Sequence, residues 1–176
     1  MFERLFSEPT SVDSSQGDVI GQVVDLSGKA LVERMGEASY QLSVGDKLYQ
    51  DDKLMTETDS SVHIEFADLS KLSVEENATL VLDELVYSRD SDDLNMDINF
   101  EVGTFLFSSG IDHSSEGHDV SIETPIATIG IRGTALVCNS DSVLTCTVLS
   151  DTIEIMNDFG TYVADSDGET VETRPG

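Results

Sequence analysis

The sequence has no tryptophan, three prolines and two cysteines, and its nine lysines and arginines face thirty-five aspartates and glutamates. The resulting formal net charge is −26. Nucleic acid is therefore excluded as an expected partner, because binding it requires Lys or Arg side chains that displace phosphate counterions. Anionic membrane surfaces are disfavoured for the same reason. A solvated acidic surface that keeps the protein soluble is the simplest explanation of the charge.

Long apolar runs and catalytic motifs are also missing. No apolar run approaches the roughly 20 residues that cross a bilayer, so we expect no membrane insertion. The N-terminal residues lack the basic and apolar segments of a recognisable signal peptide. There is no GxSxG, no HExxH, no phosphate-binding loop and no dinucleotide fingerprint. We therefore expect a protein that is not an enzyme.

The apolar pattern that is present has the period of β-strands. Residues 62–66 read Val-His-Ile-Glu-Phe, and residues 94–100 alternate in the same way. No helical period is sustained between residues 19 and 164. About a dozen short strands separated by Gly, Ser, Asp and Asn turns predict an all-β fold. A β-sandwich, a roll and a short β-solenoid all remain open.

The length of 176 residues fits one domain with an aliphatic core. We expect a polar lead-in over residues 1–18, a β domain over residues 19–164, and a polar acidic tail over residues 165–176.

The two cysteines, Cys138 and Cys146, flank a segment with turn chemistry at residues 139–142. If a hairpin forms there, the two side chains could face each other and form a disulfide. They could equally be two buried small hydrophobic residues on adjacent strands. Their spacing matches neither CxxC nor a zinc pattern.

The tail contains three carboxylates, Asp165, Asp167 and Glu169, that resemble the first half of a calcium-binding loop. The twelfth position, which would supply a bidentate glutamate, is Gly176. Calcium at this turn is an alternative to a solvated tail, and we expect no other cofactor.

Three sequence blocks occur in a fixed order. The first is Leu42-Ser43-Val44-Gly45-Asp46, the second is Gly-Thr-Phe-Leu-Phe-Ser-Ser-Gly at residues 103–110, and the third is TPIATIGIRGT at residues 124–134. This order resembles that of FecR-type domains, from about Ile20 to Ala164. The chain departs from the family pattern at residues 67–70, where the aspartate is kept but the usual glycine and threonine are absent.

The third block also has a physical interpretation. Pro125 favours extended backbone at Thr124, and Gly130 and Gly133 permit a bulge or a positive φ. Arg132 lies in so acidic a chain that we expect it to pair with a carboxylate or cap carbonyl groups, as a buried clamp. We expect the family motifs to stabilise the fold rather than to bind a ligand. The residues given this structural role are Gly45, Asp46, Thr124, Pro125, Ile129, Gly130, Arg132, Gly133 and Thr134.

The FecR resemblance implies a domain outside the cytoplasm that contacts other proteins or carbohydrate. We expect a non-enzymatic interaction module of an exported or cell-surface-associated bacterial protein, which binds protein or carbohydrate or assembles with itself through strand edges. A weaker similarity of residues 21–46 to N-terminal retention modules of type I-secreted adhesins points the same way. The alternative is an extracytoplasmic signalling module of an anti-sigma, iron-regulator type system. The chain shows neither N-terminal sigma-binding helices nor a transmembrane segment, and a cytoplasmic location stays open.

Overall fold

The computed structural model describes residues 18–88, 93–110 and 118–176, which contain fourteen strands and no helix. The predicted all-β fold is confirmed. No helix able to cross a membrane occurs in the described ranges. The strands are β1 (Val19–Ser27), β2 (Ala30–Glu33), β3 (Tyr40–Gln41), β4 (Lys47–Tyr49), β5 (Lys53–Thr56), β6 (Ser61–Phe66), β7 (Lys71–Val74), β8 (Thr79–Ser88), β9 (Asp93–Ser108), β10 (His118–Glu123), β11 (Thr128–Ser140), β12 (Leu144–Asn157), β13 (Gly160–Ala164) and β14 (Thr170–Thr173).

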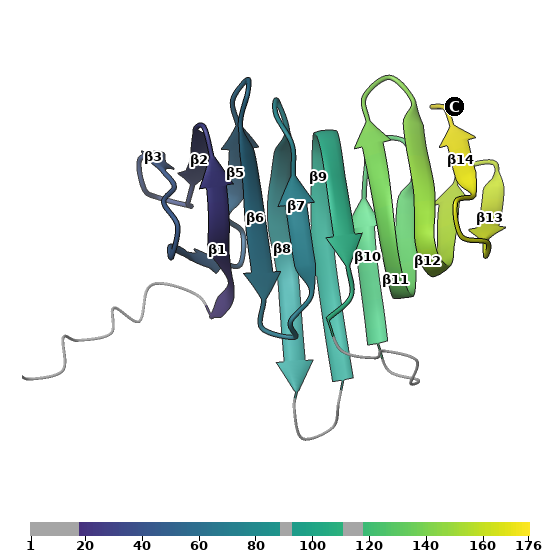
Figure 1. Ribbon diagram of the computed structural model, residues 1–176, viewed down its shortest axis with the longest axis horizontal. Helices are drawn as coiled ribbons and strands as arrows, with labels where there is room; N and C mark the ends of the chain where they lie inside the picture. Colours follow the sequence, from purple (N-terminus) through teal and green to yellow (C-terminus); the bar gives the residue numbers. More distant parts are fainter. Residues whose placement is uncertain (1–17, 89–92, 111–117) are drawn as a thin grey trace, which may run out of the picture.

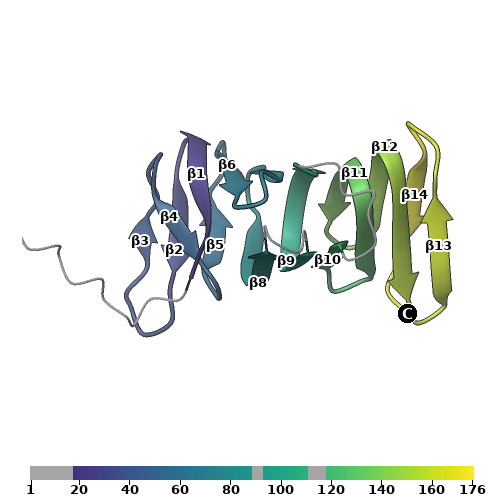
Figure 2. The same ribbon diagram turned by 90° about the horizontal axis from the view of Figure 1, so that it is seen from below.

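The strands form one mixed sheet that is folded into two leaves (Figure 1). The first leaf has the order β4-β1-β6-β7-β9-β11-β12-β14. The second leaf has the order β3-β2-β5-β8-β9-β10-β11-β12-β13. All these pairs are antiparallel except β9 with β10. Strands β9, β11 and β12 belong to both leaves. Figure 2 shows the strands side by side along the longest axis, from β3 and β4 at one end to β13 and β14 at the other.

A row of residues with left-handed backbone marks the crease between the leaves. Six of these residues lie where the chain passes from one leaf to the other, between β1 and β2, β5 and β6, and β7 and β8, and within β9, β11 and β12. They are Gly28, Asp59, Asn77, Gly103, Gly133 and Asp151. Their φ angles run from 55° to 119°. Only Gly, Asn and Asp tolerate this region readily, which explains why these three residue types occupy all six positions.

The crease keeps apolar side chains inside both leaves. In β9 the even-numbered residues from Leu94 to Phe100 are buried, but beyond Gly103 the buried residues are Phe105 and Phe107. A regular strand would expose one of these two sets, because its side chains alternate without interruption. The left-handed residue resets the alternation. Phe100 and Phe105, one from each leaf, then meet with ring centroids 4.4 Å apart.

The β domain extends further than the sequence indicated. Strand β14 pairs with β12 from Leu144 opposite Thr173 to Thr147 opposite Thr170. The predicted boundary after Ala164 is therefore too early. In this strand only Val171 is buried, so its alternation was too weak to separate it from a polar tail.

Arg132 is not a buried clamp. Its side chain is exposed, and no hydrogen bond or ion pair of its guanidinium occurs in the described part of the chain. The prediction is wrong because Arg132 follows the inward-facing Ile131 directly, and strand alternation places it on the outer face of the second leaf.

Arg34 is the arginine that the core holds. Its Nε lies 2.7 Å from Asp52 Oδ1, and a second guanidinium nitrogen donates to Asp52 Oδ2 at 2.8 Å. Asp52 is fully buried and also accepts a hydrogen bond from the backbone N–H of Tyr49, whose ring centroid lies 4.4 Å below the guanidinium. The hydrogen bond with Asp52 raises the pKa of Arg34 above its usual value. A bidentate, charge-assisted pair of this kind satisfies both ions.

The crease predicts unequal effects at two neighbouring glycines. Gly133→Ala is expected to lower the free energy of unfolding by about 1–2 kcal/mol, because a residue with a Cβ resists the left-handed backbone. A methyl group would meet no atom there, so the loss would come from the backbone alone. Gly130→Ala is the control, since Gly130 has no positive φ and its methyl would lie at ordinary contact distance. Urea unfolding measures both, and equal losses would contradict the assignment.

The buried ion pair predicts a second difference. Asp52→Ala leaves the Arg34 guanidinium without its partner and should lower the free energy of unfolding by about 3 kcal/mol. Arg132→Gln, which removes an exposed charge, should change it by less than about 0.5 kcal/mol. Thermal and urea unfolding of both variants test this, and the account fails if Arg132→Gln is the more damaging of the two.

Candidate functional site

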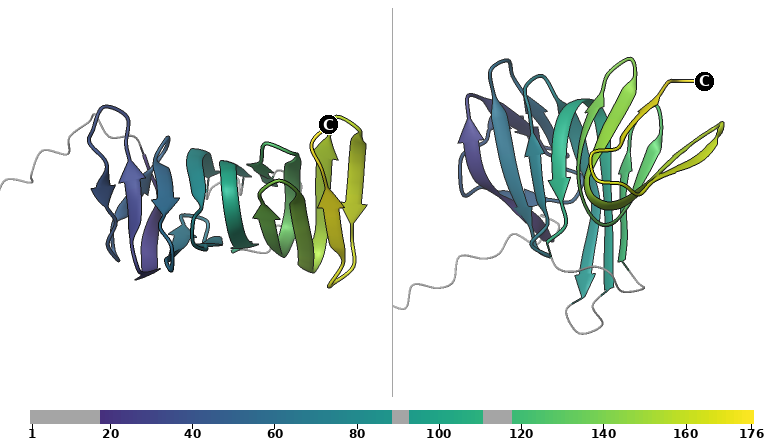
Figure 3. Two further views of the ribbon diagram at one scale, coloured as in Figure 1. Left: turned by 90° about the horizontal axis from the view of Figure 1, so that it is seen from above. Right: turned by 45° about the vertical axis from the view of Figure 1, so that its right-hand side comes forward.

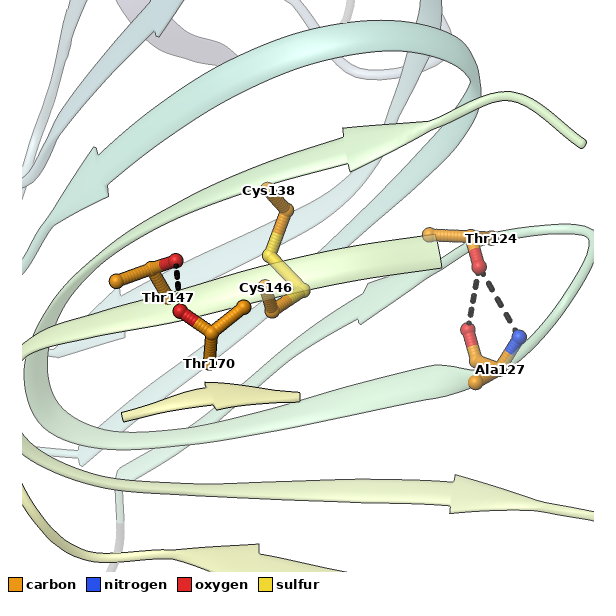
Figure 4. Close-up of a disulfide and its surroundings, with 6 residues drawn as sticks. All are labelled: Thr124, Ala127, Cys138, Cys146, Thr147 and Thr170. Carbon is orange, nitrogen blue, oxygen red and sulfur yellow. Dashed lines mark hydrogen bonds between the residues drawn. A yellow bond between two sulfur atoms is a disulfide. The ribbon is translucent and has the colours of Figure 1, made fainter. Parts of the chain in front are cut away.

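The first four residues of the TPIATIGIRGT segment, 124–127, connect β10 to β11, and the remaining seven form the first half of β11. The Thr124 hydroxyl donates to the carbonyl oxygen of Ala127 at 2.8 Å and accepts from the backbone N–H of Ala127 at 3.0 Å (Figure 4). The backbone N–H of Thr124 also donates to the Ala127 carbonyl oxygen, at 3.0 Å. Pro125 lies inside this closed turn, and Ile129 beyond it is fully buried. The turn leads from β10 into β11, which lies between β10 and β12.

The end of the same segment builds the crease. Gly133 has a φ of 63°, and the ladder with β12 shifts register between Arg132 and Ala135, so the predicted bulge is present. Thr134 is buried, and its hydroxyl lies 2.7 Å from the carbonyl oxygen of Thr152 and 2.9 Å from that of Arg132. Of the two glycines for which the sequence permits a bulge or a positive φ, Gly133 has a positive φ and Gly130 does not.

Gly45 and Asp46 close another turn. Gly45 has a φ of 95°, and the Asp46 carboxylate accepts the backbone N–H of Ser43 at 2.8 Å. The backbone N–H of Val23 donates to the Asp46 carbonyl at 2.9 Å, which fastens the turn to β1. These two residues hold Leu42 and Leu48 over the core at this end of the molecule, where both are buried.

Cys138 and Cys146 form a disulfide across β11 and β12, directly opposite each other in the ladder (Figure 4). Both residues are buried. Of the two readings that the sequence left open, the structure contains the disulfide. On the far side of β12, the Thr147 and Thr170 hydroxyls lie 2.8 Å apart and connect β12 to β14.

The three tail carboxylates do not converge. Glu169 accepts the Tyr162 hydroxyl at 2.6 Å and the backbone N–H of Asp165 at 3.2 Å. The hydrogen bond between Tyr162 and Glu169 raises the pKa of Tyr162 and lowers that of Glu169. Within the described ranges, no three His, Cys, Asp or Glu side chains group as a metal site. Glu169 holds the connection between β13 and β14, and calcium at this turn stays the alternative that the sequence offered.

Carboxylates also gather on the outer face of the second leaf. Burial raises the pKa of Asp83, and the nearby Asp51, Glu123 and Asp97 raise it further. Asp97 accepts the Ser121 hydroxyl at 2.7 Å. The carboxylates of this cluster therefore repel one another on the outer face of the sheet.

A serine and a histidine meet on the first leaf. Ser73 Oγ lies 2.9 Å from His63 Nδ1, and Asp25 is opposite His63 in the neighbouring ladder. This contact could not be found from the sequence, because the three residues lie in three different strands. Among the described residues, the side chain of His63 is hydrogen-bonded to Ser73 and not to Asp25, so no carboxylate completes a triad. We assign no catalysis to this arrangement.

A groove of about 410 Å³ lies at the end of the molecule formed by β13 and β14. One wall comes from the second leaf and the other from the first leaf, and the lining residues are Ile155, Asn157, Phe159, Gly160, Thr161, Tyr162, Thr170, Val171, Glu172 and Thr173. Asn157 donates to the Thr173 hydroxyl at 2.8 Å across it. Figure 3 shows β13 and β14 as the last strands at this end. The groove is the candidate binding site.

Sequence reasoning missed this groove and the Arg34–Asp52 pair. Alternation could have found the pair, since Asp52 has the same parity as the buried Leu54 and Arg34 the same parity as Val32. An inward carboxylate requires a cation partner. The groove had no such signal, because it depends on two strands whose separation the crease decides.

Comparison with known proteins agrees with this fold. The family model for "FecR protein" matches residues 52–154. Two crystal structures of a "putative anti-sigma factor" from Parabacteroides distasonis ATCC 8503, at 1.65 and 2.50 Å resolution, each superpose with a TM-score of 0.52 at 12% identity. The similarity covers 70% of this chain but 59% of that protein, so this chain spans less than two thirds of its length. No curated protein matches the sequence.

At 12% identity the crystal structures establish a common fold alone. The family match is more informative, because it covers more than half of the chain and contains the Thr124–Thr134 turn and crease. The chain belongs to the FecR protein family.

Proposed function

We propose that this chain is a non-enzymatic protein-binding module of an extracytoplasmic signalling system of the anti-sigma type. The family match over residues 52–154 carries this proposal, because FecR proteins are regulatory. The similar fold of an anti-sigma factor supports the same class of function. Of the two readings that the sequence offered, this was the alternative, and it now has the better support.

The disulfide supports a location outside the cytoplasm. Cys138 and Cys146 are both buried, and their bond joins two long strands near the groove end of the core. Disulfides persist in oxidising compartments and are rare where thioredoxin and glutathione keep thiols reduced. A fold that includes this bond is suited to an extracytoplasmic compartment.

The residues that line the groove favour protein binding over catalysis. The groove is lined by apolar rings, hydroxyl groups and one carboxylate, Glu172, and its lining contains no nucleophile–base pair. Apolar surface with a polar rim is the usual composition of a protein-binding surface. The chain would then relay the state of a partner through binding.

Electrostatic repulsion opposes the other hypothesis, in which copies of the chain assemble through their strand edges. Each copy has a formal net charge of −26, so copies that meet through strand edges must overcome strong repulsion. A signalling module requires no such contact between copies.

The test is transcriptional. The gene segment that encodes this chain is deleted in its own organism, and transcripts are compared with those of the parent and of a strain complemented with the intact chain. A signalling role predicts a change in a limited group of genes that share one promoter motif, reversed by complementation. An unchanged transcriptome together with lost surface attachment would refute the proposal and support the structural reading.

A further inference from the structure

The two ends of the folded sheet are built differently. At one end, the edge strands β3 and β4 have two and three residues, and Leu42 and Leu48 cover the core. At the other end, β13 has five residues and β14 has four, and among the described strands each pairs with β12 alone. Short edge strands are one way in which β-proteins prevent unwanted pairing. The first end is therefore closed to further strands and the second end is open.

Strand β13 lacks the devices that normally protect an edge. Its sequence, Gly-Thr-Tyr-Val-Ala, contains no proline and no charged residue. Tyr162 and Val163 are 49% and 50% exposed, and Phe159 in the preceding turn is 77% exposed. Alternate backbone N–H and C=O groups of β13 face away from β12, its one partner among the described strands.

The groove continues the core out to this edge. Ile155 is paired with Tyr162 in the ladder, so both side chains point between the leaves. Val171 reaches the same space from β14. Alternate side chains of an added strand would cover Phe159 and Tyr162, while its backbone would pair with β13.

The negative charge at the open end favours a basic binding partner over a second copy of the chain. Residues 151–176 contain seven carboxylates and one arginine, Arg174, which pairs with Glu172 at 3.1 Å. Two copies joined edge to edge would bring two such acidic sets together, at a cost in repulsion. An incoming segment with Lys or Arg on its solvent side would instead be attracted to Asp158 and Glu172.

We propose that the open end binds one extended, basic segment of a partner protein, which adds to β13 as a further strand. The segment has roughly five to seven residues, with apolar side chains toward the groove and Lys or Arg side chains toward solvent. This inference rests on the proposed role as a protein-binding module and identifies the surface and the chemistry of the partner.

The experiment uses the full chain and a fluorescein-labelled synthetic peptide, Thr-Lys-Val-Lys-Val-Lys-Val-Lys-Thr. Fluorescence anisotropy should show saturable binding that weakens as salt is added. Phe159→Ser should weaken the binding by about tenfold, because it removes an anchor of the groove. Met35→Ser is the matched control, an exposed apolar residue outside the groove, and should leave the affinity within about twofold. Both residues are exposed enough that the variants should fold.

Two further peptides separate strand addition from simple charge attraction. One carries Glu in place of Lys and should not bind. The other keeps every Lys but has proline at the central Val, which prevents continuous pairing, and should bind at least about tenfold more weakly. Equal binding of the proline peptide, or an unchanged affinity of Phe159→Ser, would overturn the proposal.

Sedimentation velocity of the free chain tests the second copy as occupant. A monomer supports the proposal, whereas a dimer that Phe159→Ser dissociates would overturn it. Peptide binding without the transcriptional effect would keep the site and reject the signalling role. A transcriptional effect without peptide binding would do the reverse.

Discussion

The crease is the constraint on which the rest of the structure depends. Strands β9, β11 and β12 each contain a residue with left-handed backbone where they pass between the leaves. One of these residues, Gly133, lies inside the family match. Without the reset in side-chain alternation, half of the apolar residues of β9, β11 and β12 would face water. The fold is thus a consequence of six local backbone conformations that act on one apolar pattern. The contacts of Thr124, Gly133 and Thr134 shape the turn and the bulge, so the expectation that the motif stabilises the fold stays a prediction.

The acidic composition makes the few cations informative. Arg34 is committed to a buried carboxylate, and Arg174 is paired at the surface, which leaves the β13–β14 end strongly negative. The same charge that disfavours a second copy of the chain favours a basic partner. Electrostatics and edge-strand geometry therefore select the same end of the molecule and the same kind of occupant.

Much of the fold could be predicted from the sequence, since strands such as residues 62–66 and 94–100 alternate clearly. The bulge at Gly133 followed from glycine chemistry. Two kinds of feature were out of reach. The exposure of Arg132 depends on the face of β11 on which its side chain lies, beside a bulge, and a motif does not reveal this. The groove depends on how the crease places two non-adjacent strands, β13 and β14. The disulfide stayed open because turn chemistry alone does not decide whether two cysteines face each other.

Hydrogen exchange of the free, monomeric chain tests the central claim most directly, namely one cooperative sheet with one open edge. The account predicts that amides of β9, β11 and β12 on both sides of the crease exchange with a common, slow rate set by global unfolding. It also predicts that alternate amides of β13 exchange much faster than their neighbours, because they face away from β12, the partner of β13 in the described part of the chain. Two leaves that open independently, or a β13 protected along its whole length in the monomer, would contradict it.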